Sequence, residues 1–108
     1  MRARIHHVAL NVVDMEWYIS FFQNVFEMRI QRTDGESPKR RVWFHEGVQL
    51  NECREEPDCG AAYDHFSLGV DDIPGAVKQA LEAGCSPLPN GEHWLKLPNG
   101  VRLELKPL

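Results

Sequence analysis

The sequence predicts an α+β fold built from two βαβββ modules, whose strands form a curved, incomplete-barrel sheet. Three observations lead to this prediction. Two segments, residues 5–14 and 63–72, share one pattern of a histidine, alternating apolar residues and a closing aspartate. A helical pattern follows each segment, and each half of the chain ends on a strand that begins after a glycine. The modules are expected at about residues 1–56 and about residues 62–108, within a single domain.

The two repeated segments predict the first strand of each module. An aspartate follows the histidine seven positions later in each, which pairs His7 with Asp14 and His65 with Asp72. Alternating apolar residues between them are typical of a half-buried strand. These residues are Val8, Leu10 and Val12 in the first segment and Phe66, Leu68 and Val70 in the second. Because successive side chains of a strand point to opposite faces, both histidines are expected on the face opposite to the apolar residues.

An amphipathic helix is expected after each of these strands. Asp14 and Asp72 are good N-cap residues, because a carboxylate accepts hydrogen bonds from the free amides of the first turn. Apolar residues then recur at three- and four-residue spacing, from Met15 to Phe26 and from Ile73 to Leu81. The second helix is expected to end at Gly84.

The last part of each module predicts a β-hairpin. Residues 42–44 and 94–97 contain the large side chains of short strands, and a turn signal follows each. The turns are His45-Glu46-Gly47 and Pro98-Asn99-Gly100, after which Val48 to Asn51 parallels Val101 to Glu104. The remaining expectations are a strand at 28–32, a weaker strand at 86–88, a loop at 34–38 and the join between modules near 55–62.

Composition and charge narrow the classes of function. The net charge is −4 and the basic residues gather only in the short run from Lys39 to Arg41, so a nucleic-acid partner is not expected. No apolar run is long enough to span a membrane and no signal-peptide pattern opens the chain, so a cytoplasmic protein without a membrane partner is expected. The three cysteines are expected as free thiols, although Cys53 and Cys59 could meet in a disulfide.

His7, His65 and Glu104 are the candidate metal ligands. Strand phase places all three on the concave side of the sheet, since Leu103 and Leu105 on either side of Glu104 are expected to pack under a helix. Two imidazoles and a carboxylate make a facial triad that suits one divalent metal ion per site, with Zn, Ni, Fe(II) and Mn as the candidates. The alternative is a hydrogen-bonded structural role for each histidine and a solvated Glu104. Agreement between the two repeats favours the metal.

The chain resembles the vicinal oxygen chelate superfamily, which includes glyoxalase I, methylmalonyl-CoA epimerase, extradiol dioxygenases, and fosfomycin- and bleomycin-resistance proteins. The resemblance covers nearly the whole chain and rests on four segments, namely residues 7–14, 17–26, 65–73 and 98–105. It implies paired βαβββ modules around a metal cavity, and the metal ligands of the family fall on His7, His65 and Glu104. One departure is Glu27, because the family usually has glycine directly after the first helix.

The resemblance also implies a fourth ligand, normally Glu, Gln or His, on the last strand of the first module. Register from Gly47 places Asn51 there, whereas Glu52 is the stronger ligand by its chemistry. One step along a strand changes the face, so Glu52 reaches the metal only if a bulge turns it inward. The sequence leaves both alternatives open, and Glu52 is carried forward as the expected ligand.

In functional terms, the resemblance implies a metal-dependent enzyme whose small-molecule substrate chelates the metal through two neighbouring oxygens. A lyase or isomerase of the glyoxalase type is expected, in which Glu52, or Glu104 displaced from the metal, moves a proton beside a carbonyl. The alternatives are an Fe(II) dioxygenase and a non-catalytic drug-binding protein of the bleomycin-resistance type, with Trp43 and Trp94 as stacking residues. Related proteins with two short modules form dimers, so a homodimer is expected.

Overall fold

The structure, a computed structural model, describes residues 1–54, 62–97 and 100–108. Its elements are β1 (Ala3–Val12), α1 (Met15–Phe26), β2 (Ile30–Asp34), β3 (Arg41–Phe44), β4 (Val48–Glu52), β5 (Tyr63–Val70), α3 (Ile73–Ala83), β6 (Ser86–Pro87), β7 (Trp94–Lys96) and β8 (Arg102–Pro107). The strands form one open sheet in the order β2-β3-β4-β1-β5-β8-β7-β6. The described residues therefore form an α+β fold with eight strands and two helices, which confirms the predicted class.

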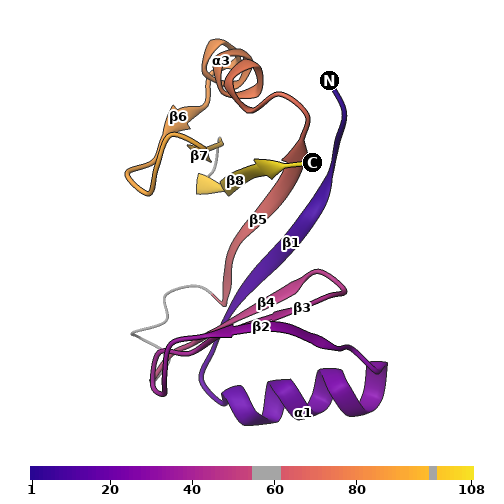
Figure 1. Cartoon of the computed structure of the whole chain (residues 1–108). Helices are drawn as coiled ribbons and strands as arrows, with labels where there is room; N and C mark the ends of the chain where they lie inside the picture. The colour runs from indigo at the N-terminus through magenta and orange to yellow at the C-terminus, as the bar shows by residue number, and fades with distance from the viewer. Residues whose placement is uncertain (55–61, 98–99) are drawn as a thin grey trace. The chain divides into compact units, whose positions relative to one another are not determined.

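Two compact units make up the chain. The first unit is His7–Asp64, and the second unit combines Met1–His6 with His65–Leu108. Figure 1 shows α1 beside β2, β3 and β4 in the first unit, and α3 near β6 and β8 in the second. The division falls inside β1, so the first residues of that strand group with the second half of the chain. The predicted join at 55–61 and the turn residues Pro98 and Asn99 lie outside the described residues.

The core of the first unit lies between α1 and one face of its strands. Asp14 caps α1 as predicted, because its side chain accepts a hydrogen bond from the Trp17 amide at 3.3 Å. The buried core residues come from three strands and the first turn of the helix, namely Val12, Met15, Val42, Phe44 and Leu50. β4 pairs in parallel with β1 and antiparallel with β3, and both registers run without interruption.

The strand after α1 begins two residues later than predicted, at Ile30 rather than Met28. Glu27 ends the helix in a left-handed conformation, and the Met28 amide bonds back to the carbonyl oxygen of Phe22 at 3.1 Å. Met28 then packs against the core and does not enter the sheet. Every residue of β2 is exposed, so no buried face marks where this strand starts.

In the second unit, α3 packs on the apolar face of β5, β7 and β8. The Asp72 side chain caps the helix by accepting from the Gly75 amide at 3.0 Å, and Gly84 ends it, both as predicted. β5 pairs in parallel with β8, which pairs antiparallel with β7. The buried core residues are Val70, Leu95, Leu103 and Leu105. Leu103 and Leu105 therefore lie on the helix side of β8, as strand phase predicted.

The cysteines correct one prediction. Cys53 is disulfide-bonded, and its partner is not among the described residues, whereas Cys85 is a free thiol. The expectation of free thiols is therefore wrong for Cys53. An odd number of cysteines requires only that one thiol stay unpaired, which leaves room for one intrachain bond.

No helix of the described residues is both long enough and apolar enough to cross a bilayer.

Candidate metal centre

His65 and Glu104 meet on the polar face of the second unit. The parallel register of β5 and β8 places Ser67 beside Glu104, and His65 lies two residues earlier on the same face of β5. The His65 Nε2 and Glu104 Oε1 atoms are 3.5 Å apart. Only 4% of His65 and 8% of Glu104 is exposed, so this pair is almost fully removed from water. Both side chains lie opposite the apolar core under α3.

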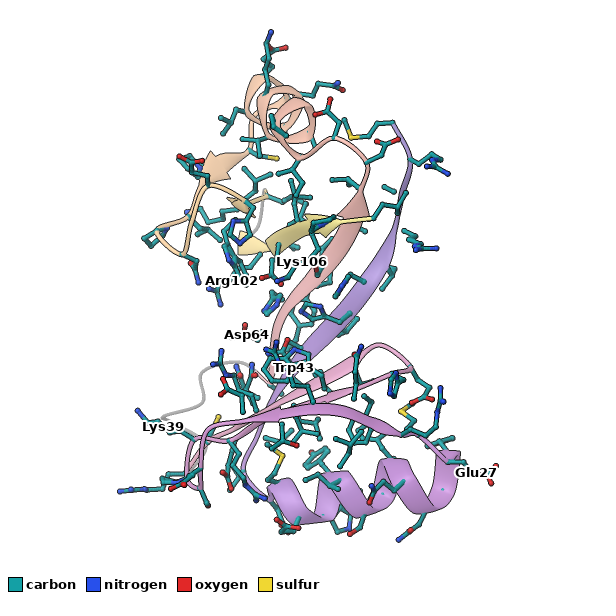
Figure 2. The ribbon with its side chains drawn as sticks, viewed as in Figure 1. Glu27, Lys39, Trp43, Asp64, Arg102 and Lys106 are labelled. Atoms are coloured by element: carbon teal, nitrogen blue, oxygen red, sulfur yellow. The ribbon has the colours of Figure 1, made fainter. Side chains whose placement is uncertain are left out.

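Neighbouring side chains on this face hold the pair in position. The Lys106 ammonium lies 3.7 Å from Glu104 Oε2, so the two carboxylate oxygens face different partners. The Trp94 ring meets the His65 imidazole edge-on with a centroid separation of 4.5 Å. The Arg102 guanidinium lies over the Trp94 ring, 5.5 Å from its centroid. Figure 2 shows Arg102 and Lys106 on β8.

Ser67 is the most unusual polar group of this face. It is completely buried, and its hydroxyl oxygen has no hydrogen-bond partner among the described residues. Leaving a buried hydroxyl unsatisfied costs about 1–3 kcal/mol. Because Ser67 is paired in register with Glu104, this unused hydroxyl lies beside the candidate metal ligands. A bound ion with its water or substrate oxygens would satisfy it, so the surroundings of Glu104 fit a ligand site.

In the first unit, His7 lies on a polar face of β1. It is 4% exposed, and alternation along β1 puts Ala9 and Asn11 on the same face. The β1–β4 register pairs Asn11 with Asn51, and the Asn51 side chain donates to Asn11 Oδ1 at 3.2 Å. Gln49 donates to Asn51 Oδ1 at 2.8 Å, which completes a row of amides. Register therefore puts Asn51 on the face of His7.

Glu52 lies on the opposite face of β4, because the registers of β4 contain no bulge. Its carboxylate accepts hydrogen bonds from the Arg40 guanidinium at 3.3 Å and from the Arg40 amide at 3.0 Å, and a further one from Ser37 at 3.1 Å. Burial by itself would raise the pKa of Glu52, but the bonds from Arg40 and Ser37 outweigh it and lower the pKa. A carboxylate with this position and these partners is a poor metal ligand and a weak base. The bulge that Glu52 needs in order to serve either role is absent from these registers.

Among the described residues, the candidate ligands are His7 in the first unit and His65 and Glu104 in the second, and all three are buried. Two ligand atoms bound to one ion at bond lengths near 2.1 Å are separated by about 3–3.5 Å. The separation of 3.5 Å between His65 Nε2 and Glu104 Oε1 is compatible with that value. Imidazole and carboxylate donors together suit divalent Zn, Ni, Fe or Mn.

Residues 4–94 match the family model of the Glyoxalase/Bleomycin resistance protein/Dioxygenase superfamily. The chain belongs to this superfamily. The resemblance found in the sequence is thus confirmed. Among curated relatives of this superfamily, lactoylglutathione lyase from Haemophilus influenzae is 26% identical over 122 residues, which covers 94% of this chain and 90% of the relative.

Solved structures of the superfamily share the fold. A variant of methylmalonyl-CoA epimerase from Streptomyces coelicolor, in complex with 2-nitronate-propionyl-CoA, is 19% identical with a TM-score of 0.69 over 94% of each chain. The 2,3-dioxygenase LapB from Pseudomonas sp. KL28 is 21% identical with a TM-score of 0.73, over 96% of this chain and 40% of that chain. At these identities the likeness shows the glyoxalase fold and leaves the reaction open.

Some residues of this face were missed by the sequence patterns. The patterns do not single out Ser67 or Lys106, and they do not associate Trp94 with Glu104. Ser67 could have been found from the pairing of β5 with β8, because their parallel register places Ser67 opposite Glu104. The Trp94 contact follows in the same way from the β7–β8 register, in which Trp94 is paired with Glu104.

Proposed function

We propose that this protein is a metal-dependent enzyme acting on a small substrate with two neighbouring oxygens, in a reaction of the lyase or isomerase type. The buried pair of His65 and Glu104, 3.5 Å apart, is the observation that carries the proposal. Removing an imidazole and a carboxylate from water costs free energy that a bound ion would offset. The similarity to lactoylglutathione lyase over 94% of the chain supports the lyase class.

In this proposal His7, His65 and Glu104 hold one divalent ion. When bound, the ion supplies Lewis-acid stabilisation of the charge that develops on a substrate oxygen. His7 comes either from the same chain or from the second copy in a homodimer, since both arrangements complete the same ligand set. Asn51, rather than Glu52, takes the fourth position, where its neutral amide orients a substrate oxygen or a water molecule.

Glu104 also takes the proton-transfer role, because Glu52 lies on the other face of β4 and is held by Arg40. One oxygen of Glu104 faces His65, and the other faces Lys106 at 3.7 Å. Displaced from the metal, the Glu104 carboxylate accepts a proton from a carbon beside the substrate carbonyl. The nearby ammonium group of Lys106 then stabilises negative charge on the substrate as the proton leaves.

Metal titration tests this function. Protein treated with a chelator and then titrated calorimetrically with Zn²⁺ or Ni²⁺ should bind one ion per site. His7→Ala, His65→Ala and Glu104→Gln should each weaken the affinity by about 100-fold, because each removes a direct ligand. The matched control is His45→Ala, which removes an exposed histidine at the β3–β4 turn. Unchanged affinity in both His7→Ala and His65→Ala would refute the site, and a non-catalytic drug-binding protein would then be favoured.

A second function, an Fe(II) dioxygenase, is favoured by one observation. With Glu52 turned away, the protein offers two histidines and one carboxylate, which is the ligand pattern of non-haem Fe(II) oxygenases. Oxygen uptake by the Fe(II)-loaded protein in the presence of catechol would support the dioxygenase. Metal-dependent turnover of lactoylglutathione without oxygen uptake would support the lyase.

A further inference from the structure

A basic pocket lies in the first unit, beside the loop that joins β2 to β3. Its volume is about 700 Å³. Its described lining comes from that loop, from β3, from the end of β4 and from the residues after β4, and it includes Lys39, Arg40, Arg41, Asn51, Glu52 and Arg54. All of them belong to the first unit.

The charges of this pocket are unequal. Among the described residues, four cationic side chains line it against one carboxylate, that of Glu52. Arg40 is occupied by Glu52 and by Glu16, whose carboxylate is 2.7 Å from the guanidinium. Arg41 is paired with Asp34 across the β2–β3 ladder. With these partners included, four cations face three anions in the described part of the chain, whereas the net charge of the whole sequence is −4.

Lys39 and Arg54 supply the excess positive charge. Neither makes an ion pair with another residue of the described part of the chain, and both are exposed. Figure 2 shows Lys39 at the edge of the first unit. An ammonium and a guanidinium that line a pocket with no carboxylate partner among the described residues suit an oxyanion, because a guanidinium binds carboxylate or phosphate through two parallel hydrogen bonds.

The pocket shares residues with the polar face that carries His7. Asn51 lines the pocket and lies on that face, and the β3–β4 register pairs it with Arg41. Arg41 therefore projects from the same side of the sheet as Asn51. An anion bound in the pocket would lie against the side chain that we assign to the fourth position of the metal site.

We propose that this pocket binds an oxyanion of the substrate, a carboxylate or a phosphate, that is separate from the two metal-chelating oxygens. The inference rests on the proposed function and specifies its substrate class: a small molecule with a chelating end and an anionic end. Lys39 and Arg54 bind the anion, and Arg41 orients it from the edge of the His7 face. Arg40 has a different role, because its contacts with Glu52 and Glu16 hold the wall of the pocket.

Anion binding can be measured without metal. The full-length protein, kept in a chelator at low salt, is titrated with inorganic phosphate and, separately, with succinate, and binding is followed by amide NMR shifts. The Lys39→Gln/Arg54→Gln variant should weaken binding about tenfold, which corresponds to losing two exposed charge contacts. The matched control is Arg4→Gln/Lys78→Gln, which removes the same charge from exposed positions of the second unit and should bind as the wild type does.

The two probes identify the source of the oxyanion. Binding of phosphate alone indicates a phosphorylated substrate, and binding of succinate alone indicates a carboxylate. Equal affinity in the wild type and the Lys39→Gln/Arg54→Gln variant would overturn the proposal. Zn²⁺ titration of the same variant should give the wild-type affinity. If the wild-type protein itself failed to bind Zn²⁺, the proposed function would be refuted. The anion titration contains no metal, so its result tests only the proposal for the pocket.

Discussion

Glu27 occupies a backbone conformation that favours glycine. Its φ is 55°, and it is the non-glycine residue with positive φ among those described. Its amide caps α1 by bonding to the carbonyl oxygen of Phe22. The superfamily glycine expected after the first helix thus corresponds to a left-handed C-cap, which this chain forms with a glutamate at a cost in free energy.

Replacing Glu27 with glycine should therefore stabilise the protein. Glu27→Gly removes the strain of a side chain in the left-handed region and should raise the free energy of unfolding by about 1 kcal/mol, as measured by urea denaturation. The opposite substitution, Gly84→Ala at the end of α3, serves as the comparison, because φ is 113° there and an added Cβ meets no atom within 4 Å. That variant should lose stability through backbone strain alone. A decrease for Glu27→Gly would contradict this account of the helix end.

Ser67 allows a test of the ligand site that does not depend on turnover. In the metal-free protein, Ser67→Ala removes a buried hydroxyl without a described partner and should raise the free energy of unfolding by about 1 kcal/mol. With Zn²⁺ present, the advantage should disappear, because the hydroxyl then has a role in the loaded site. Thermal unfolding with chelator and with Zn²⁺ measures both effects. Ser86→Ala, at an exposed position of β6, should change neither.

At the scale of elements, Arg40 ties α1 to the end of β4. Its guanidinium contacts Glu16 in the first turn of the helix at 2.7 Å and Glu52 on the strand at 3.3 Å. Hydrogen bonds to both carboxylates raise the pKa of Arg40. The Glu52 side chain is only 9% exposed, so this pair belongs to the structure of the first unit and explains why Glu52 faces away from His7.

The pH dependence of stability should reveal this pair. The pKa of Glu52 is lowered in the folded protein, so the unfolded chain binds more protons between the folded value and the unfolded value of about 4.3. The stabilisation is complete above that unfolded value and is lost as pH falls through the folded one. Glu52→Gln should cost about 1–2 kcal/mol at pH 7, and the gap to the wild type should narrow toward pH 3. Urea denaturation across this range measures it, with the exposed Glu36→Gln as control. A gap that stays constant with pH would show that the charge of Glu52 is not involved.

Strands with one buried face could be predicted from the sequence. The contacts that their side chains make with residues far away in the sequence could not. Alternation in β1, β5 and β8 placed His7, His65 and Glu104 opposite the apolar residues, as the structure has them, although their role as metal ligands stays a prediction. β2 has no buried residue, so its ends could not be predicted. The partner of Glu52 depends on the loop before β3, and strand phase contains no information about that loop.

For the whole molecule, the strand order leaves β2 and β6 at the two ends of the sheet. The residues of both strands are exposed, and unpaired edges of this kind are commonly covered by another chain. We expect a homodimer. Sedimentation at micromolar concentration should give twice the mass of the 12.4 kDa chain, and a monomer that still binds metal would refute this expectation.

The division of β1 between the two units has a consequence for dissecting this protein. The backbone and side chain of Arg2 bond to Asp71, and the first six residues group with the half of the chain that begins at His65. A fragment cut at the join between modules would lack this neighbour of β5 and would carry an unpaired strand that invites self-association. The second half of the chain thus depends on the first for the strand beside β5. A protein made of the second repeat alone would therefore have to pair β5 with a strand of another identical chain.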